Sequence, residues 1–247
     1  MIKSKDNPKI KEARKLIKEG RAIKIEGRKI IFEVLKEGLS PIFLFLTEKD
    51  PKLETLTQSS GGTVLFVKKN VLKSLSSLKT PQGQILLVKP PRWEEKNWKY
   101  VIILERVQDP ANLGSIIRTA YCLGYDAIYS DEETASPYSP KVLRSSSGYA
   151  LKMPFFRVKN LEKKIIELRN KEFPIIGTFP KGGVSPEEMG QLDKFAIIFG
   201  NEGQGISQKL QNLLTERITL KMKQGESLNV SASAAIILYL LKNPLFL

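Results

Sequence analysis

The sequence contains no histidine and a single cysteine, Cys122. Histidine is the commonest general base and metal ligand of enzymes, so its absence leaves proton transfer to Glu, Asp, Lys, Tyr, water or a group of the substrate. With one cysteine, a zinc site lacks its usual ligands and no internal disulfide can form. Cys122 stands beside Leu123 in a helical pattern, so we expect it to be a buried small hydrophobe.

Long apolar runs are also missing. No stretch approaches the roughly 20 apolar residues that a membrane span requires, and residues 1–5 do not lead into a stretch of signal-peptide character. The hydrophobic fraction of 41% is ordinary for a globular protein, and 247 residues suffice for one large or two small domains. We therefore expect a cytoplasmic protein that does not associate with membranes.

Positive charge is abundant. The formal net charge is +14, and residues 1–95 hold 20 basic and 11 acidic residues, whereas residues 96–247 hold 20 and 15. The shorter part is thus the more basic one, and residues 1–30 alone carry 11 basic and 4 acidic side chains. A generally basic surface would explain the total, but this distribution favours nucleic acid as the partner.

Residues 1–89 show the pattern of a small α/β domain. Asn7-Pro8 is typical of a helix cap with a first-turn proline, and the residues that follow predict a basic amphipathic helix. The predicted helices are 7–18, 29–36, 50–58 and 68–78, and the predicted strands are 42–46, 63–67 and 85–88. Paired prolines and charged residues then predict a linker over 90–99.

Residues 100–247 alternate between strand and helix patterns. The predicted strands are 100–105, 125–130, 155–158, 174–178, 195–199 and 217–221. The predicted helices are 112–123, 139–146, 160–172, 206–215 and 228–242. Alternation of this kind predicts a parallel sheet with helices on both faces.

Three polar segments in this half follow strand-like runs and lead into helical patterns. They are DPANLGSIIRT at 109–119, FGNEGQG at 199–205 and SLNVS at 227–231. Ligands bind at the carboxyl ends of the strands in an open α/β sheet. Three such ends in one domain therefore suggest one shared site.

The first segment combines a turn with a helix start. Asp109-Pro110 favours a turn, Asn112 can cap the following helix, and Gly114 allows another backbone to come close. Arg118 lies four residues beyond Gly114 and on the same side of the helix. A capped helix with one surface arginine would explain each residue singly, but an arginine at a strand-end crevice suits a phosphate.

The second segment has three glycines in six residues, at 200, 203 and 205. It matches neither the dinucleotide fingerprint nor the P-loop. Glu202 disfavours a phosphate and favours a ligand that carries a positive charge or a hydroxyl group. The alternative is a tight turn with a solvated glutamate.

The third segment opens an apolar helix. Ser227 is a candidate N-cap, with Asn229 and Ser231 then inside the helix, where they are neutral or unfavourable. The small residues from Ser231 to Ala235 permit close packing, a chain crossing or a subunit contact.

The three segments, in this order and spacing, resemble the three motifs of the SpoU/TrmH family of RNA 2′-O-ribose methyltransferases. The resemblance covers residues 100–242, and residues 1–89 resemble more loosely the small substrate-binding domain that many members carry. It implies an α/β fold: a parallel-sheet SPOUT domain tied in a deep trefoil knot over 100–247, preceded by an α/β RNA-binding domain over 1–89. It also implies S-adenosylmethionine (SAM) as methyl donor, no metal, and a homodimer paired through the knotted domain.

Site residues follow from the resemblance by position. The implied catalytic residues are Asn112, Arg118, Glu202, Ser227 and Asn229. The implied cofactor-binding residues are Thr178, Gly200, Asn201, Gly203, Leu220, Met222, Leu228 and Asn229. In the family, Arg118 corresponds to either the general base or the group that holds the phosphate. Because an arginine side chain does not give up its proton in proteins, we favour phosphate binding and stabilisation of negative charge on oxygen.

Two residues depart from the family pattern. Lys221 stands where a proline usually follows the last strand, which bears on cofactor affinity. Tyr149 follows the matched patch Arg144–Gly148 where a small residue is common, which bears on the interface or on RNA contact.

Three functions are compatible with these observations. An RNA ribose methyltransferase is favoured, with rRNA over tRNA as substrate because of the added basic domain. A base-directed RNA methyltransferase of the same fold is the second, and a catalytically silent RNA-binding or resistance protein is the third. The intact motifs argue against the third.

Overall fold

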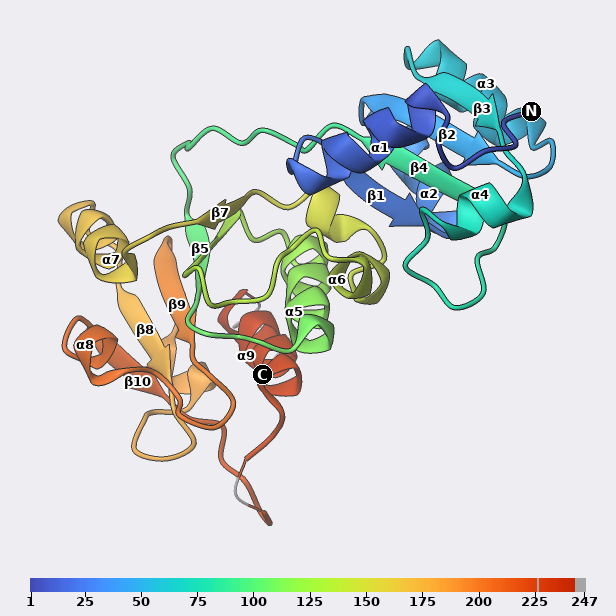
Figure 1. Ribbon diagram of the computed structural model, residues 1–247. Helices are drawn as coiled ribbons and strands as arrows, with labels where there is room; N and C mark the ends of the chain where they lie inside the picture. The colour runs from blue at the N-terminus through green and yellow to red at the C-terminus, as the bar shows by residue number, and fades with distance from the viewer. Residues whose placement is uncertain (226, 243–247) are drawn as a thin grey trace. The chain divides into compact units, whose positions relative to one another are not determined.

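Figure 1 shows the computed structural model, which describes residues 1–225 and 227–242. The chain divides into two compact units, Met1–Arg92 and the part from Trp93 onward. The first contains a four-stranded sheet and the second a six-stranded sheet.

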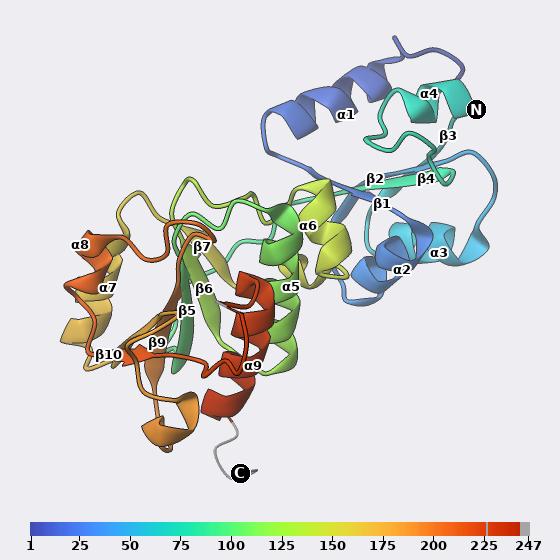
Figure 2. The ribbon, with the colours of Figure 1, turned by 90° about the horizontal axis from the view of Figure 1, so that it is seen from below.

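The first unit is a mixed sheet with helices on both faces. Its helices are α1 (Pro8–Lys18), α2 (Arg28–Lys36), α3 (Pro51–Ser59) and α4 (Lys69–Lys73). Its strands are β1 (Ile23–Glu26), β2 (Pro41–Leu46), β3 (Thr63–Phe66) and β4 (Gln84–Val88), in the order β1-β4-β2-β3. Strand β2 pairs with β3 in parallel and with β4 antiparallel. Helices α1 and α4 lie on one face of this sheet and α2 and α3 on the other (Figure 2).

The helix cap at Asn7 is confirmed, because its Oδ1 accepts a hydrogen bond from the Lys9 amide at 2.9 Å. Strand β1 was missed, because four residues between two helical patterns give too short a signal. The helix predicted over 68–78 ends instead at Lys73. Beyond it, Ser76 and the Ser77 amide donate hydrogen bonds to the Glu26 carboxylate, so this segment turns toward β1 instead of continuing the helix.

The second unit confirms the predicted parallel sheet. Its strands are β5 (Tyr100–Leu104), β6 (Ala127–Ser130), β7 (Phe155–Arg157), β8 (Ile175–Thr178), β9 (Phe195–Phe199) and β10 (Glu216–Ile218). Their order is β10-β8-β9-β5-β6-β7, and every pair is parallel. The α-helices are α5 (Pro110–Cys122), α6 (Pro140–Ser145), α7 (Leu161–Asn170), α8 (Gln208–Gln211) and α9 (Val230–Lys242). Two 3-10 helices, η1 (Tyr149–Leu151) and η2 (Pro186–Met189), complete it.

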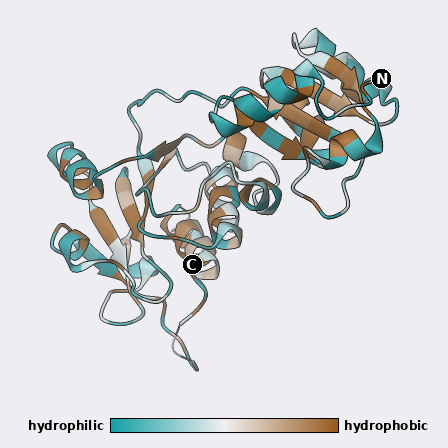
Figure 3. Cartoon of the chain, viewed as in Figure 1, coloured by the Kyte–Doolittle hydropathy of each residue, from teal (hydrophilic) through white to brown (hydrophobic). Residues whose placement is uncertain are grey.

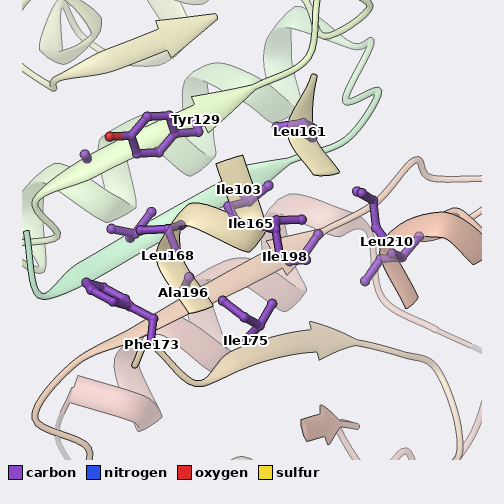
Figure 4. Packing of buried hydrophobic residues seen from close by; sticks show 13 residues of the cluster. Ile103, Tyr129, Leu161, Ile165, Leu168, Phe173, Ile175, Ala196, Ile198 and Leu210 are labelled. Atoms are coloured by element: carbon purple, nitrogen blue, oxygen red, sulfur yellow. The ribbon is translucent and has the colours of Figure 1, made fainter. Parts of the chain in front are cut away.

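Both faces of this sheet are covered. Helices α7 and α8 lie on one face and α5 and α9 on the other (Figure 2). Strand residues such as Ile103 and Ile198 pack against Ile165 and Leu168 of α7 (Figure 4). The strands carry the hydrophobic residues, while the exposed faces of the helices are hydrophilic (Figure 3). A sheet that is covered by helices on both faces requires strands that are apolar on both sides.

Two expectations for this unit were wrong. The helix predicted over 206–215 is a single turn, α8, of which Leu210 is buried in the core. Cys122 is exposed at the end of α5 and is not a core residue. Within residues 1–225 and 227–242, no helix is both long enough and apolar enough to cross a membrane.

Candidate active site

The site lies where the direction of strand addition reverses. From β5 the chain adds β6 and β7 on one side, whereas β9 pairs with β5 on the other side. The loops that leave β5 and β9 therefore diverge, which is where open α/β sheets bind their ligands. Strands β8 and β10 continue the sheet beyond β9 (Figure 1). The segments predicted to bind the cofactor therefore come directly after strands that are neighbours in the sheet.

The loop after β9 is closed by backbone contacts. Asn201 and Gly205 exchange two backbone hydrogen bonds, at 3.1 and 2.9 Å. A Cβ atom at Gly200 would lie 2.3 Å from the carbonyl carbon of Gly205, so only glycine fits there. The Asn201 side chain accepts hydrogen bonds from the amides of Gly203 and Gln204. The loop that carries Glu202 is thus held in one shape.

Arg106, at the end of β5, ties this loop to the sheet. Its guanidinium donates to Gln204 Oε1 at 2.6 Å, and its carbonyl accepts from Asn201 Nδ2 at 2.9 Å. Its φ of 55° is unusual for a residue other than glycine, and its Nε is buried without a hydrogen-bond partner. The sequence does not single out Arg106, because neither its backbone angle nor its contacts leave a pattern in the sequence.

Asn112 joins the three polar segments. Its Nδ2 donates to Glu202 Oε1 at 2.8 Å, and its Oδ1 accepts from Asn229 Nδ2 at 3.1 Å. Asn112 is 8% exposed whereas Glu202 and Asn229 are exposed, so these bonds lie at the boundary between the core and the solvent. One chain of hydrogen bonds therefore runs from the first segment to the second and the third, as the shared strand-end position predicted.

Two details of the sequence prediction were wrong. Asn112 is not a helix cap: Asp109 caps α5, and its Oδ1 accepts from the Ala111 amide at 2.9 Å. Asn229 does not lie inside α9 but caps it, since its Oδ1 accepts from the Ser231 amide at 2.8 Å. Ser227 therefore is not the cap; it lies three residues before Val230, the first residue of α9, and is exposed. At the start of α5, the cap by Asp109 leaves the Asn112 amide to bond with Glu202 and Asn229.

The Asp109 carboxylate has a second partner. Lys141 Nζ lies 2.9 Å from its Oδ1. The hydrogen bond from the Ala111 amide and then the ion pair with Lys141 lower the pKa of Asp109. The start of α5 thus carries a charged cap at neutral pH.

Arg118 lies apart from this chain of hydrogen bonds. It is exposed and, within the part of the chain that the structure describes, makes no hydrogen bond or ion pair. Six residues of helix separate it from Asn112, which corresponds to about 9 Å along the axis and about 120° around it. Arg118 therefore projects from a different face of α5 than Asn112.

The Arg144–Gly148 patch packs against the first segment. A Cβ atom at Gly114 would lie 1.9 Å from Ser145 Oγ, and Ser145 Oγ donates to the carbonyl of Pro110 at 3.2 Å. Tyr149 stacks on Tyr121 of α5 with 4.6 Å between ring centroids. The close approach expected at Gly114 is thus the contact between α5 and α6.

The remaining predicted cofactor residues follow β8 and β10. Thr178 ends β8, and its hydroxyl donates to the Ile198 carbonyl at 2.9 Å, which leaves backbone groups for a ligand. Leu220 and Met222 follow β10, and Leu228 is exposed just before α9. Lys221 lies 3.2 Å from Glu188 in an exposed ion pair. This arrangement suits a ligand such as SAM. Backbone groups and apolar side chains suit its uncharged ring, and the Glu202 carboxylate suits its cationic group.

Across residues 1–225 and 227–242, no group of three or more His, Cys, Asp or Glu side chains is placed to hold a metal ion.

A family model described as the SpoU rRNA Methylase family matches residues 99–239. The chain belongs to the SpoU rRNA methylase family. A second model, described as an MRM3-like substrate binding domain, matches residues 7–86.

Relatives resemble the chain over its whole length. The 23S rRNA (guanosine(2553)-2′-O)-methyltransferase RlmP of Bacillus subtilis is 31% identical over 98% of this chain and 98% of its own. An rRNA methyltransferase from Sinorhizobium meliloti is 26% identical and superposes with a TM-score of 0.84 over 100% of this chain and 98% of its own. The AdoMet-bound form of an rRNA methyltransferase from the same organism is 24% identical, has a TM-score of 0.81 and the same coverage, and shows the shared fold.

Membership of the SpoU family confirms the predicted fold class and the predicted activity, SAM-dependent 2′-O-methylation of RNA. The two matched regions, 7–86 and 99–239, fall in the two compact units, and the predicted domain boundaries stay a prediction. The trefoil knot and the roles of single residues stay predictions.

Proposed function

We propose that the site formed by Asn112, Glu202 and Asn229 transfers a methyl group from SAM to a ribose 2′-hydroxyl of rRNA. The observation that carries this proposal is the hydrogen-bond chain from Glu202 through Asn112 to Asn229. It assembles residues from three strand ends into one polar surface.

The donor would lie at the carboxyl ends of β8, β9 and β10. Thr178, Gly200, Asn201, Gly203, Leu220, Met222, Leu228 and Asn229 are proposed to hold it, mostly through backbone groups. When bound, SAM supplies an activated methyl group on a positively charged sulfur. The crowding at Gly200 keeps the β9 loop tight against this position.

Positioning accounts for most of the acceleration that such a transfer requires. Asn112 fixes the Glu202 carboxylate at 2.8 Å, which lets its second oxygen accept a hydrogen bond from a hydroxyl group. Asn229 bonds to the opposite side of the Asn112 amide, and Ser227 precedes it in the segment before α9. Arg118 is proposed to bind the RNA phosphate and to stabilise negative charge as the hydroxyl loses its proton.

The position of Arg118 supports a homodimer in which it serves the partner's site. Within one chain it projects from a different face of α5 than Asn112. Helix α9, which packs against α5, exposes Ile236 and Tyr239 at 43% and 46%. These two residues are three apart and share one side of the helix. An apolar strip of this kind suits an isologous contact between two copies.

The first unit is proposed to bind the RNA. Residues 1–89 would recognise the substrate, 90–99 would link the units, and 100–247 would carry the catalytic site. The exposed basic side chains of α1 support this, because they suit phosphate contacts. Relatives named for rRNA favour rRNA over tRNA as substrate, and this in turn favours a cytoplasmic location.

The proposal is tested by incubating the protein with SAM labelled in its methyl group and with unmodified rRNA or tRNA. We expect label in 23S rRNA and little in tRNA. A protein that binds SAM but labels neither RNA would overturn the proposal, and label in tRNA alone would overturn the choice of substrate.

A further inference from the structure

The first unit contains a cleft of about 500 Å³. It is lined by the segment that follows β2, by helix α4 and by the start of β4. Its volume falls within the range of about 300–1,000 Å³ that is usual for ligand sites. No residue implied by the family resemblance lies in it.

Gln84 presents an unused acceptor in this cleft. Its Oε1 is buried and has no hydrogen-bond partner. The residue is held firmly, because β4 pairs Gln84 with Leu46 of β2 and the Thr47 amide donates to the Gly83 carbonyl at 2.9 Å. A buried acceptor without a partner costs free energy, so its presence at a cleft points to a ligand that donates a hydrogen bond.

Three lysines supply positive charge around the cleft. Lys49, Lys69 and Lys73 are exposed lining residues, and none of them makes a hydrogen bond or ion pair to another residue that the structure describes. Asp50, one of two lining carboxylates, is already paired with Arg28 at 2.6 Å, which lowers the pKa of Asp50. Lys69 and Lys73 lie on α4, on the same face of the sheet as the basic helix α1 (Figure 2).

Apolar side chains contribute to the lining of the cleft. Leu46 and Leu72 are lining residues and are each 2% exposed. A hydrogen-bond acceptor next to apolar lining atoms suits the edge of a nucleobase, and lysines at the rim suit its phosphates.

We propose that this cleft binds one unpaired nucleotide of the substrate RNA. The base enters beside Leu46 and Leu72, a base N–H or a ribose hydroxyl donates to Gln84 Oε1, and the lysines contact the flanking phosphates. A paired base in an A-form helix is stacked and its edge is occupied, so a single-stranded loop or bulge is the form that fits. The inference rests on the proposed function, since it names how the RNA of that reaction is recognised.

The test measures binding of the full chain to a single-stranded 12-nucleotide RNA of mixed sequence and to its duplex with the complementary strand. We expect the single strand to bind at least tenfold more tightly than the duplex at 150 mM salt. Gln84→Met, which keeps the length but removes the acceptor, should weaken single-strand binding about tenfold. The salt dependence should not change, because no phosphate contact is lost.

Lysine variants test the phosphate contacts through the salt dependence of RNA binding. Lys69→Gln and Lys73→Gln should each lower the slope of log affinity against log salt by about 0.7. Lys36→Gln, at the exposed end of α2 and outside the cleft, is the matched control and should change neither quantity. Two results would show that the cleft does not bind RNA. One is an equal loss of RNA affinity in the cleft variants and in the control, and the other is wild-type RNA affinity in Gln84→Met.

Thermal unfolding of Gln84→Met guards against a folding artefact. Removing an unsatisfied buried acceptor should leave the melting temperature of the free protein equal or higher, so weaker RNA binding cannot be ascribed to unfolding. A lower melting temperature would mean that Gln84 is structural and would count against the proposal.

Cross-linking locates the contact directly. RNA carrying 4-thiouridine, irradiated with the wild-type protein, should attach to peptides that contain residues 69–73 or 81–84. Attachment elsewhere alone would contradict the cleft. These experiments measure RNA binding, so they test the cleft even if the protein transfers no methyl group. If the wild-type protein methylates RNA and the cleft variants bind RNA normally, the cleft is not the binding site, and the proposed function stands.

Discussion

Asn112 donates a hydrogen bond to Glu202 at 2.8 Å although 90 residues separate them in the sequence. The bond links the first turn of the helix after β5 to the loop after β9, across the point where strand addition reverses. Asn112 also accepts from Asn229, so it can fill both roles only as an amide.

The amide of Asn112 is therefore the first target. In Asn112→Asp, a carboxylate faces Glu202 and the donated bond is lost, so we expect kcat/KM to fall about 100-fold and the free energy of unfolding to fall by about 1–3 kcal/mol. Steady-state transfer of labelled methyl groups measures the first and denaturant unfolding the second. Asn212→Asp, at the exposed C-terminal cap of α8, is the control. Equal activity in the two variants would refute the role assigned to Asn112.

Arg106 should govern how firmly the β9 loop is held. Arg106→Ala removes the bond to Gln204, so we expect faster amide hydrogen exchange at Gly203 and Gln204. We also expect weaker SAM binding, by about tenfold, as measured by calorimetry. Unchanged exchange at these amides would show that the backbone bonds between Asn201 and Gly205 suffice to hold the loop.

Gly200 and Gly203 offer a matched pair in one loop. Gly200→Ala places a methyl group against the backbone of Gly205 and should cost about 1–3 kcal/mol of stability together with SAM binding. Gly203→Ala has space, with its nearest neighbour at 3.6 Å, and should be milder in both measurements. The reverse order would contradict the arrangement of the loop.

The charged cap of α5 predicts a pH dependence. The pKa of Asp109 is lowered in the folded protein by the Ala111 amide and Lys141, so its stabilising effect is present above the unfolded pKa, near 3.8, and is lost as pH falls through the lower folded value. Asp109→Asn keeps an acceptor for the cap but not the charge. Thermal melts should show the variant less stable than wild type at pH 7, and the gap should narrow as the pH falls below 3.8. A gap that is constant with pH would contradict this.

Mixing two inactive variants tests whether Arg118 acts across the dimer. Arg118→Ala should lose transfer but keep SAM affinity within a few-fold, because Arg118 serves the RNA; Arg118→Lys should also be severely impaired, since lysine lacks the planar fork. If Arg118 acts in trans, an equal mixture of Arg118→Ala and Glu202→Gln subunits, exchanged and re-formed, restores roughly a quarter of wild-type activity, because mixed dimers hold one intact site. No restoration would place Arg118 and Glu202 in the same site within one chain.

The sequence predicted that three polar segments at strand ends share one site. The hydrogen bonds of Asn112 confirm that these segments meet. It did not predict which polar residue would cap each helix, because Asp109, Asn112, Ser227 and Asn229 are all good capping residues and tertiary contacts decide among them. Arg106 was missed for a related reason: its strained φ is imposed by its neighbours. Cys122 was misplaced because helical periodicity indicates a face but not what covers it.

The same limits apply to the fold. Alternating patterns predicted the parallel sheet, since strands buried on both faces are continuously apolar. Strand β1 was missed because it is short, and α4 ends early because Ser76 and Ser77 bond to Glu26, a partner 50 residues away. Such long-range bonds have no local signal.

The identity of the methylated atom is the most direct test of the account. The protein is incubated with SAM carrying a labelled methyl group and with unmodified 23S rRNA, and the RNA is digested to nucleosides and separated by mass spectrometry. The account predicts the label in a 2′-O-methylated nucleoside, at a bond that also resists alkaline cleavage. Label on a base, at a position that alkali still cleaves, would contradict it.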